Sequence, residues 1–355
     1  MPEGRAGGAG RNAASAREPR WSRAPGGSRG SGVSRPQTGG ERRRSALAPA
    51  KIDLHLGVGP LRPDGLHGLV AVSQSLSLYS RVTLTAEPDS AEDSLVASGP
   101  GTELIPQPGA LVQRAIRRCF EVARRPPEPV RIEIDTDIPV ASGLGGGAAD
   151  AAAALLAADE VFGLGLGISE LAGIAASLGT HVPLALHGGT VLGIGHGESI
   201  TPMPFRGSAL HWVVAMARDG LDAAETYAEL DRRRQAGSAP VSVSFDAEGD
   251  AIDDGHIDLA RALAGGDARA IAANVRNELG GAALALRPAL RRALEDGREG
   301  GALAALVAGS GPTCLFLCAD AEAAVDIATE LATSGAAHAI RTASSPVGGA
   351  RLIEE

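Results

Sequence analysis

The sequence predicts an α+β fold built from two domains, and three observations lead to this prediction. The chain has 355 residues, which is long enough for two modest domains with hydrophobic cores. Residues 130–138, V-R-I-E-I-D-T-D-I, alternate apolar and polar side chains, as a strand with one wet face does, and a glycine cluster and an alanine-rich helix follow. Residues 303–318 run from a helix end through a glycine turn into an apolar strand, which indicates a second mixed unit.

Residues 1–47 differ in composition from the rest of the chain. They contain ten arginines and three glutamates, and Gly, Ser and Pro fill most of the remainder, so we expect a disordered tail. Such a tail could contact nucleic acid, could be an organelle-targeting segment, or could result from an upstream start codon that adds a dispensable extension. We expect no nucleic-acid contact elsewhere, because the chain as a whole has a net charge of −9.

The cysteines and the apolar segments indicate the cellular compartment in which the protein is expected. No apolar run approaches the ~20 residues that cross a membrane, and no hydrophobic signal-peptide core is evident. Cys119, Cys314 and Cys318 are too few and too apolar in setting for a disulfide framework or a zinc site, so we expect buried thiols in a reducing compartment. These features predict a cytoplasmic protein with no membrane partner.

The first predicted domain covers residues 48–206. A strand, A-K-I-D-L-H-L-G-V, leads through the turn R-P-D-G-L-H to two further extended segments, L-V-A-V-S-Q-S-L-S-L and S-R-V-T-L-T-A. Residues 109–124 have apolar side chains at helical spacing. The alternating strand, the glycine cluster and the alanine-rich helix come next, and residues 168–178 predict another helix with Ser169 as its N-cap.

The second predicted domain covers residues 207–355. The strand H-W-V-V-A-M-A leads into the helix A-A-E-T-Y-A-E-L, and a polar, acidic linker occupies residues 236–256. Helices are predicted over residues 257–275 and 286–297, followed by the glycine turn, the apolar strand, the helix A-A-V-D-I-A-T-E-L and a last strand. This order suggests a domain of ferredoxin-like type.

The glycine cluster lies within residues 139–155, P-V-A-S-G-L-G-G-G-A-A-D-A-A-A-A-L. Its glycines can adopt backbone angles closed to other residues and let a ligand approach the main chain. The following helix offers unpaired N–H groups and the positive end of its dipole, which favour a phosphate. The segment therefore predicts a nucleotide-binding loop.

Other interpretations of this loop can be weighed on the sequence alone. G-L-G-G-G-A formally fits the dinucleotide pattern G-x-G-x-x-G/A, but the Rossmann version follows a strand buried on both faces, and no second strand ending in an acidic residue follows here. A Walker loop is excluded because no G-K-[ST] occurs. For this segment considered alone, an ordinary flexible glycine turn before a helix remains an alternative interpretation.

Lysine usage singles out one position. Of the 33 basic residues, only Lys51 is a lysine. It could have persisted by chance. It could also be required, because a compact, flexible ammonium cannot be replaced by a planar guanidinium.

Four segments together resemble the GHMP kinases. They are K-I-D-L-H-L with R-P-D-G-L-H-G-L, P-V-A-S-G-L-G-G-G-A-A-D-A-A, L-G-T-H-V-P-L-A-L-H-G-G-T-V-L-G-I-G-H-G-E and V-A-G-S-G-P-T, in the order and spacing of that family. The resemblance spans about residues 50 to 352. It implies a ribosomal-protein-S5-like N-terminal domain, a ferredoxin-like C-terminal domain and an active site in the cleft.

The resemblance also implies an activity. Within the family the segments are most similar to the branch that transfers the γ-phosphoryl group of ATP, with Mg²⁺, to the 2-hydroxyl of a cytidylyl-methylerythritol in non-mevalonate isoprenoid synthesis. The expected partners are this small molecule and ATP, and the expected oligomeric state is a monomer or a homodimer. A second member of the family acting on another alcohol, or a non-catalytic nucleotide-binding protein, are the alternatives.

The resemblance assigns roles to individual residues. The loop around the ATP phosphates would be Pro139, Val140, Ala141, Ser142, Gly143, Leu144, Gly145, Gly146, Gly147, Ala148 and Ala149. Lys51 and His181 would be catalytic, and Asp53, Leu66 and His67 would bind substrate, with His67 reading the cytosine edge. The turn Gly309, Ser310 and Gly311 would close the phosphate side of the cleft. No protein residue is assigned as a metal ligand.

Several positions depart from the family pattern. His181 stands where the family has its catalytic aspartate, in G-T-H-V-P instead of G-[AS]-D-V-P. Asp53 replaces an asparagine, and Leu66 replaces a tyrosine that stacks on cytosine. Ala148 replaces a serine whose hydroxyl faces phosphate or Mg²⁺, and Ala110 replaces an asparagine. A neutral histidine could still accept a proton, since its ordinary pKa is near ~6.5.

Overall fold

The computed structural model describes residues 42–354 except residues 64, 103–108, 196–198, 242, 246–250 and 253–254. Glu41–Glu355 form one compact unit. Most of the predicted tail therefore lies outside the described residues, as do the H-G-E end of the G-I-G-H-G-E segment and parts of the predicted linker.

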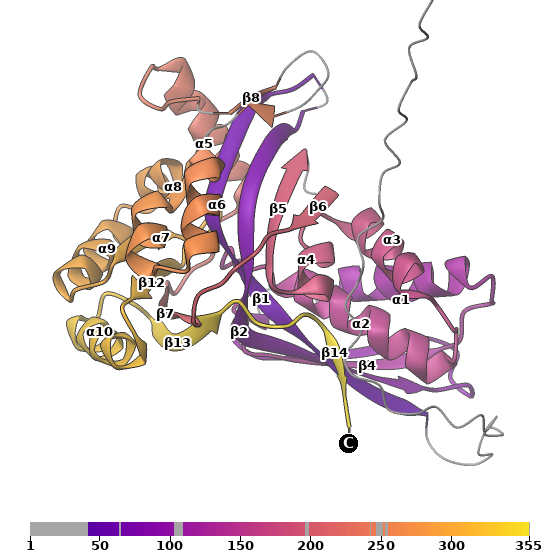
Figure 1. The fold of residues 1–355 in the computed structure, drawn as a ribbon. Helices are drawn as coiled ribbons and strands as arrows, with labels where there is room; N and C mark the ends of the chain where they lie inside the picture. The colour runs from indigo at the N-terminus through magenta and orange to yellow at the C-terminus, as the bar shows by residue number, and fades with distance from the viewer. Residues whose placement is uncertain are drawn as a thin grey trace, which may run out of the picture. The chain divides into compact units, whose positions relative to one another are not determined.

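The first sheet is built around two long antiparallel strands, β1 (Arg43–Leu61) and β2 (His67–Ala86) (Figure 1). The strand β2 joins into one element the two extended segments that the sequence predicts separately. The other strands of this sheet are β3 (Ser94–Ser98), β4 (Val130–Thr136), β5 (Thr190–Gly195), β6 (Ser199–Pro202), β10 (Arg276–Asn277) and β14 (Arg351–Ile353). Within the described residues the sheet has eight strands, with the order β10-β1-β2-β4-β3, with β14 on β1 and with β5 linking β2 to β6.

The first strand begins earlier than the sequence predicts. Residues 43–47, assigned to the disordered tail, pair with β2, and three of them also pair with β14. Arg43 forms an ion pair with Glu133 of the same sheet at 3.3 Å, and Arg44 forms one with Glu160 of a covering helix at 3.7 Å. The prediction was wrong here because the run of arginines concealed the start of the apolar segment A-L-A-P-A, which belongs to the strand.

Helices cover one face of this sheet (Figure 1). They are α1 (Ala110–Val122), α2 (Gly146–Phe162), α3 (Ile168–Leu178) and α4 (Val182–His187). The central helix, α2, packs on β1 and β2 on one side and on α1 on the other, and ten of its residues are buried. Its run of alanines suits a helix enclosed on most sides, because small side chains let neighbouring backbones come close.

The cap of α3 differs from the prediction. Gly167, not Ser169, is its N-cap, and Glu170 Oε2 accepts a hydrogen bond from the Gly167 N–H at 2.7 Å. A glutamate at the third helical position supplies this bond without a capping hydroxyl.

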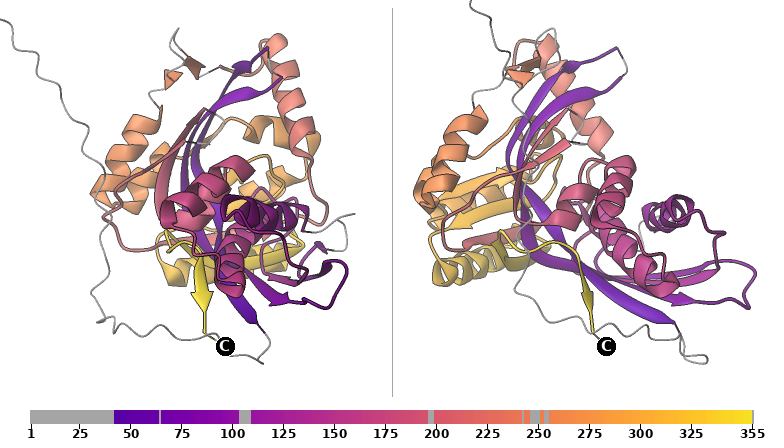
Figure 2. Two further views of the ribbon diagram at one scale, coloured as in Figure 1. Left: turned by 90° about the vertical axis from the view of Figure 1, so that its right-hand side faces the viewer. Right: turned by 45° about the vertical axis from the view of Figure 1, so that its right-hand side comes forward.

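The second sheet has four antiparallel strands. They are β7 (Leu210–Met216), β11 (Ala304–Val307), β12 (Cys314–Cys318) and β13 (Ala339–Ser345). Their order, β11-β12-β7-β13, places the first strand of the unit between the third and the fourth. The helices α9 (Leu290–Glu299) and α10 (Ala321–Ser334) pack on this sheet, seen among the orange and yellow segments of Figure 2. The ferredoxin-like arrangement of this unit is thereby confirmed, although residues 304–307, predicted as a helix end, form a strand, and β10 and β14 belong to the first sheet.

The segment between β7 and β11 holds further short elements. They are α5 (Ala223–Gln235), β8 (Ser244–Phe245), β9 (Ala251–Ile252), α6 (Gly255–Gly265), α7 (Ala268–Asn274) and α8 (Gly280–Leu286). The single helix predicted over residues 257–275 is two helices, because Gly266 adopts φ 76° and Asp267 caps the next helix. None of the helices in the described part of the chain is long and apolar enough to cross a membrane.

Candidate active site

The glycine loop ends at the N-terminus of α2. Gly143 has φ 80° and Gly145, the N-cap of α2, has φ 75°, which is the left-handed region that favours glycine. Gly146 and Gly147 form the first helical turn, whose N–H groups have no preceding carbonyl within the helix to bond. The sequence thus places backbone donors and the positive end of the helix dipole at one point.

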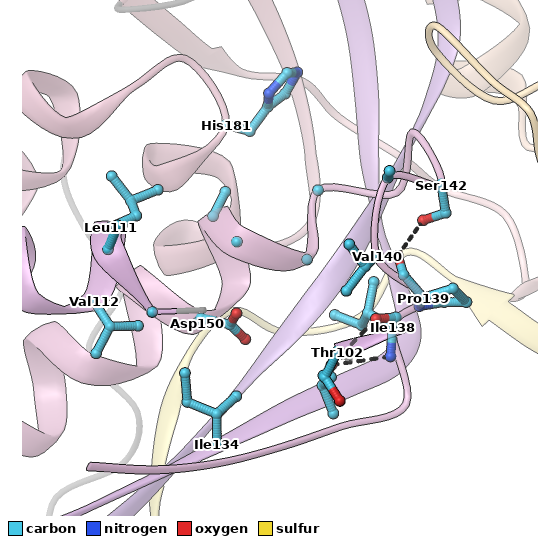
Figure 3. A pocket seen from close by; sticks show the side chains of 18 of the residues that line it. Thr102, Leu111, Val112, Ile134, Ile138, Pro139, Val140, Ser142, Asp150 and His181 are labelled. Atoms are coloured by element: carbon cyan, nitrogen blue, oxygen red, sulfur yellow. Dashed lines mark hydrogen bonds between the residues drawn. The ribbon is translucent and has the colours of Figure 1, made fainter. Parts of the chain in front are cut away.

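A cavity of about 520 Å³ lies at this helix terminus. The glycine loop lines it together with the start of α1, Asp150 and His181, and Figure 3 shows the last two on either side of the first turn of α2. Of the eleven predicted loop residues, Leu144 and Ala149 are not in the lining and are buried in the core. The volume falls within the ~300–1,000 Å³ range of small-molecule sites.

Two substituted positions also line this cavity. Ala148 and Ala110 both belong to the lining, so each places a methyl group where the family pattern has a polar side chain. The neighbouring Ser142 hydroxyl donates to the Pro139 carbonyl at 2.6 Å, drawn as a dashed line in Figure 3. Backbone groups therefore carry most of the polarity at this end of the cavity.

Lys51 lies on β1 directly behind the loop. Its backbone N–H donates to the Leu144 carbonyl at 2.9 Å, and its side chain is so close to Gly145 that a Cβ there would lie 2.9 Å from Lys51 Cγ. The register of β1 with β2 shifts just before and just after residues 51–53. Such bulges bend a strand and re-aim its side chains, which explains how a residue of the sheet reaches the loop.

The glycine–serine–glycine turn between β11 and β12 closes against the same lysine. A Cβ on Gly309 would lie 3.4 Å from Lys51 Nζ and 3.5 Å from Asp53 Oδ2. A Cβ on Gly143 would lie 2.2 Å from the Ala308 carbonyl oxygen. The loop, the lysine and the turn are therefore in contact, although they come from three distant segments of the sequence.

Asn277, on β10, holds this turn and is not among the predicted residues. Its Nδ2 donates to the carbonyls of Val307 and Gly309, each at 2.7 Å, and its Oδ1 accepts from the Leu279 N–H at 2.9 Å. A lone asparagine in R-N-E-L gives no recognisable motif, so the sequence held no signal for this role.

Asp53 directs its carboxylate at Lys51. Oδ2 accepts from Lys51 Nζ at 2.5 Å, and Oδ1 accepts from Ser73 Oγ at 2.7 Å. Burial disfavours the charged carboxylate, but the attraction of Lys51, a smaller attraction of His181 and the two hydrogen bonds outweigh it, so the pKa of Asp53 is lowered. The two side chains form an ion pair that is almost inaccessible, with side-chain exposures of 7% and 2%.

His181 is the N-cap residue of α4 and faces the cavity. Its Nδ1 lies 3.2 Å from Thr180 Oγ1. Burial and then the charge of Lys51 lower the pKa of His181 to about 4, against a smaller opposing effect of Asp53. The imidazole is therefore uncharged at neutral pH and has a ring nitrogen able to accept a proton.

Asp150 is a further acidic residue of the cavity that the sequence analysis did not assign. It lies in the first part of α2, and its Oδ1 accepts a hydrogen bond from Ser80 Oγ. Burial raises the pKa of Asp150 to about 6, although the Ser80 hydrogen bond acts in the other direction. Its position in A-A-D-A-A, the one acidic residue of the alanine-rich helix start, was the available signal.

Leu66 and His67 lie at the start of β2, away from the glycine loop in sequence and beside α5. Leu66 is 53% exposed. His67 Nδ1 lies 2.9 Å from the Gly59 carbonyl oxygen, and Nε2 lies 3.3 Å from Asp231 Oδ2. Both ring nitrogens therefore have acceptor partners within the protein, and the ring is fixed in orientation.

Tyr227, on α5, stacks on this histidine and was also missed. The ring centroids of Tyr227 and His67 are 5.2 Å apart with an interplanar angle of 20°. Burial and then the charge of Asp53 raise the pKa of Tyr227 to about 12. The signal was scarcity, because the chain has only two tyrosines.

The residues present suit a magnesium ion that arrives with a nucleotide. Among the described residues no group of three or more His, Cys, Asp or Glu side chains could hold a metal ion. Mg²⁺ usually keeps several waters and is bound by one or two carboxylates together with substrate phosphates, so such a cage is not required. Asp150 is the carboxylate that lines the cavity and is the side chain available for that contact.

Two family models match the chain. The N-terminal domain of the GHMP kinases matches residues 110–190, and the C-terminal domain of the GHMP kinases matches residues 259–337. The chain is 47% identical to the 4-diphosphocytidyl-2-C-methyl-D-erythritol kinase of Nocardia farcinica, over 86% of this chain and 95% of that protein. It is 46% identical to the protein of the same name from Salinispora arenicola, over 86% of this chain and 92% of that protein.

Solved structures give the same result for the fold. A crystal structure of 4-(cytidine 5'-diphospho)-2C-methyl-D-erythritol kinase matches with a TM-score of 0.64 and 26% identity, covering 86% of this chain and 100% of that chain. A homoserine kinase from Cytophaga hutchinsonii matches with a TM-score of 0.65 at 17% identity, covering 88% and 98%, and is similar in fold.

Proposed function

The chain belongs to the GHMP kinases, and on this premise we propose that it transfers the γ-phosphoryl group of ATP to the 2-hydroxyl of 4-diphosphocytidyl-2-C-methyl-D-erythritol. It is a small-molecule kinase that uses ATP as co-substrate. The observation that carries the choice of substrate is the name shared by relatives that are 42–47% identical over 86–87% of this chain. We place the reaction in the cytoplasm and propose Mg²⁺ as the metal.

The end of the cavity at the glycine loop, here called the phosphate end, has the groups that phosphoryl transfer requires. The backbone donors at Gly146 and Gly147 bind the phosphates, and the ammonium of Lys51, held behind the loop, stabilises charge on the transferring group. A bound Mg²⁺ supplies further neutralisation of phosphate charge. Phosphoryl transfer proceeds through a loose transition state, so positioning and electrostatics provide most of the catalysis.

The proton of the substrate hydroxyl goes to His181 in this proposal. A bond forms between the hydroxyl oxygen and the γ-phosphorus, the bond from that phosphorus to the bridging oxygen of ADP breaks, and the hydroxyl proton moves to the imidazole nitrogen. His181 suits this role because it faces the cavity and is uncharged. General-base assistance is worth about 10²–10⁴ in rate, so it adds to positioning without being the whole of catalysis.

The stacked pair His67 and Tyr227 is the proposed site of the cytosine ring. A flat base binds well against an aromatic face, and a ring already fixed in orientation loses little freedom on binding. Leu66 offers an apolar contact in place of the family tyrosine, so this chain relies more on the α5 side of the site.

One assay tests the proposal. Purified protein is incubated with ATP, Mg²⁺ and 4-diphosphocytidyl-2-C-methyl-D-erythritol, and ADP release is measured together with the phosphorylated product by ³¹P NMR. Homoserine and mevalonate serve as competing alcohols, and Lys51→Met serves as the inactive control. We expect product from the cytidylyl compound alone.

Two results of this assay would overturn the proposal. Preferential phosphorylation of another alcohol would identify a second member of the family with a different substrate. Thermal stabilisation by ATP without any phosphorylated product would identify a non-catalytic nucleotide-binding protein, which the replacement of an aspartate by His181 makes the relevant alternative.

A further inference from the structure

A second cavity lies beside α5, β10 and the start of α8, apart from the cavity at the glycine loop. Its volume is about 360 Å³, and in the described part of the chain the two cavities share no lining residue. We propose that this second cavity binds the phosphoryl group of a small molecule between the guanidinium groups of Arg233 and Arg276. It is a further binding site, separate from the proposed kinase reaction.

The two arginines come from distant segments and line the same cavity. Arg233 lies in α5 and Arg276 lies in β10. The helices α5 and α8 pack on each other beside it, as Figure 1 shows. Two cations in one cavity repel each other, and an anion bound between them replaces this repulsion with attraction.

Packing against α8 holds the Arg233 guanidinium in place. A Cβ on Gly281 would lie 3.7 Å from Arg233 Nη2 and 3.9 Å from both Cζ and Nε, so the group lies against this glycine. Its Nη2 also donates to the Ser238 carbonyl at 3.4 Å. A side chain that is held before a ligand arrives loses little conformational freedom on binding.

The protein supplies no charge that balances these two cations. Within the described residues neither Arg233 nor Arg276 forms an ion pair, and the buried Nε of Arg233 has no hydrogen-bond partner there. Glu278, the acidic residue of the lining, is already paired with Arg234 at 3.2 Å and accepts from the Val58 N–H at 2.6 Å. The cavity is therefore left with two positive charges that an anion can balance.

A phosphoryl group matches this charge. A phosphate monoester carries about −1.5 to −2 at neutral pH, whereas a carboxylate carries a single charge. Guanidinium groups bind phosphate oxygens through paired N–H···O bonds, which a point charge such as an ammonium cannot do. The volume of the cavity falls within the ~300–1,000 Å³ range of small-molecule sites, so an organic group fits beside the phosphoryl group.

Asn277 connects this cavity with the turn at Gly309. It lines the cavity, and its Nδ2 donates to the carbonyls of Val307 and Gly309. A ligand bound at Arg276 would lie next to the residue that holds this turn against Lys51. The proposed site thus adjoins the phosphate end of the active site without being part of its cavity.

Calorimetric titration with inorganic pyrophosphate tests the site, because it measures binding without turnover. The wild type is compared with Arg276→Gln, with Arg233→Gln/Arg276→Gln, and with Arg232→Gln as the matched control. Arg232 is the neighbour of Arg233 on α5, is paired with Glu229 and is not in the lining of the cavity. Urea midpoints verify the fold of each variant, and titration with an ATP analogue that is not hydrolysed verifies the glycine loop.

We expect the wild type and Arg232→Gln to have a saturable pyrophosphate site that Arg276→Gln weakens at least about tenfold and the double variant loses, since each arginine provides charge-assisted hydrogen bonds. All four proteins should bind the ATP analogue equally. Acetate, with one charge, should not occupy the site. UDP distinguishes the source of the phosphoryl group: tighter binding than pyrophosphate identifies an organic diphosphate, and equal or weaker binding identifies the inorganic ion.

Identical pyrophosphate isotherms for the wild type and the double variant would overturn the proposal, and so would acetate binding at the site with the affinity of pyrophosphate. Arg276 is exposed, so Arg276→Gln alone decides if the double variant does not fold. The kinase assay is a separate measurement. An active wild type without an arginine-dependent site overturns only the second site, and an inactive wild type with that site overturns only the proposed function.

Discussion

The proposed phosphate-binding end of the site, at the glycine loop, and the proposed substrate-binding end, at the start of β2, differ in what makes their contacts. At the phosphate-binding end, a methyl group added to Gly143 or Gly309 would meet neighbouring atoms, and Lys51 is 5% exposed. At the substrate-binding end, side chains make the contacts: Leu66 is 53% exposed, and the His67 side chain, which stacks on Tyr227, is 7% exposed.

This difference separates what tolerates substitution from what does not. Backbone donors remain when a side chain changes, so Ala148 can replace a serine while the first turn of α2 still offers its N–H groups. A side chain that touches a base is the contact itself, so its replacement changes recognition. We therefore expect the chemistry to depend on the packed end and the choice of substrate on the exposed end.

The largest effect should follow Lys51→Met. The substitution removes the ammonium and leaves the Asp53 carboxylate buried without its partner, so we expect a loss of about 3–5 kcal/mol in the free energy of unfolding and about 10³-fold in kcat. Urea unfolding and ADP release measure the two. The double variant Lys51→Met/Asp53→Asn should regain most of the stability but none of the activity; equal stability of the single and double variants would contradict the ion-pair account.

The second largest effect should follow Gly143→Ala. Compared with Gly147→Ala, it contrasts a tightly packed position with an open position of the same loop. The added Cβ would lie 2.2 Å from the Ala308 carbonyl oxygen at a residue with φ 80°, so we expect about 2–4 kcal/mol of destabilisation. Gly147→Ala is the control, because no atom lies within 4 Å of its added Cβ, and it should leave the free energy of unfolding unchanged or raise it by about 0.4–1 kcal/mol. Equal effects of the two substitutions would show that the loop is not packed against the turn.

Asp150→Asn tests the buried carboxylate beside the first turn of α2, whose pKa is raised. The pKa of Asp150 is about 6 in the fold and its ordinary value is 3.8, so between these values the folded state keeps a proton that the unfolded state has lost. Stability therefore falls as pH rises through this window, and above it the penalty is constant. We expect the variant to exceed the wild type by about 1–3 kcal/mol in free energy of unfolding at pH 7 and to match it at pH 4. A difference that does not change with pH would show that Asp150 does not titrate in this window.

The smallest effect should come from the exposed end. Tyr227→Ala removes a face of the aromatic pair and should raise the KM for the cytidylyl substrate about five- to tenfold, close to the lower value of about 1 kcal/mol for base stacking, with the KM for ATP unchanged. Leu66→Tyr should lower the same KM by a similar factor. Initial-rate kinetics with each substrate varied in turn measure both. A change in the KM for ATP would place Tyr227 at the wrong end of the site.

The fold was largely predictable because its signals are local. The alternation of residues 130–138 and the apolar run before the last helix each predict an element from its own side chains. The errors concern information that lies elsewhere in the chain. Whether residues 43–47 are a strand depends on partners in β2 and β14, and the break between α6 and α7 depends on Gly266.

The site was predictable where a motif carries it and not where a single side chain does. The glycine loop, Lys51 and the turn at Gly309 form recognisable patterns, and the structure brings them into contact. Lys51 and Asp53 are two residues apart on one strand and so share a face, but the contacts that fix their ion pair come from Ser73 and the turn at Gly309, in distant segments. Asn277 and Tyr227 act through hydrogen bonds and stacking between distant segments, so no sequence window contains both partners.

The pairing of β14 with β1 has a consequence for the order in which the site forms. Residues 351–353 lie beside residues 45–47, so the strand that carries Lys51 is covered by a segment far from it in the sequence. The turn at Gly309 that confines the lysine is also distant in sequence. Contacts between distant segments form late because closing a long loop costs entropy, so we expect the local structure of α2 and its glycine loop to form before the lysine is confined.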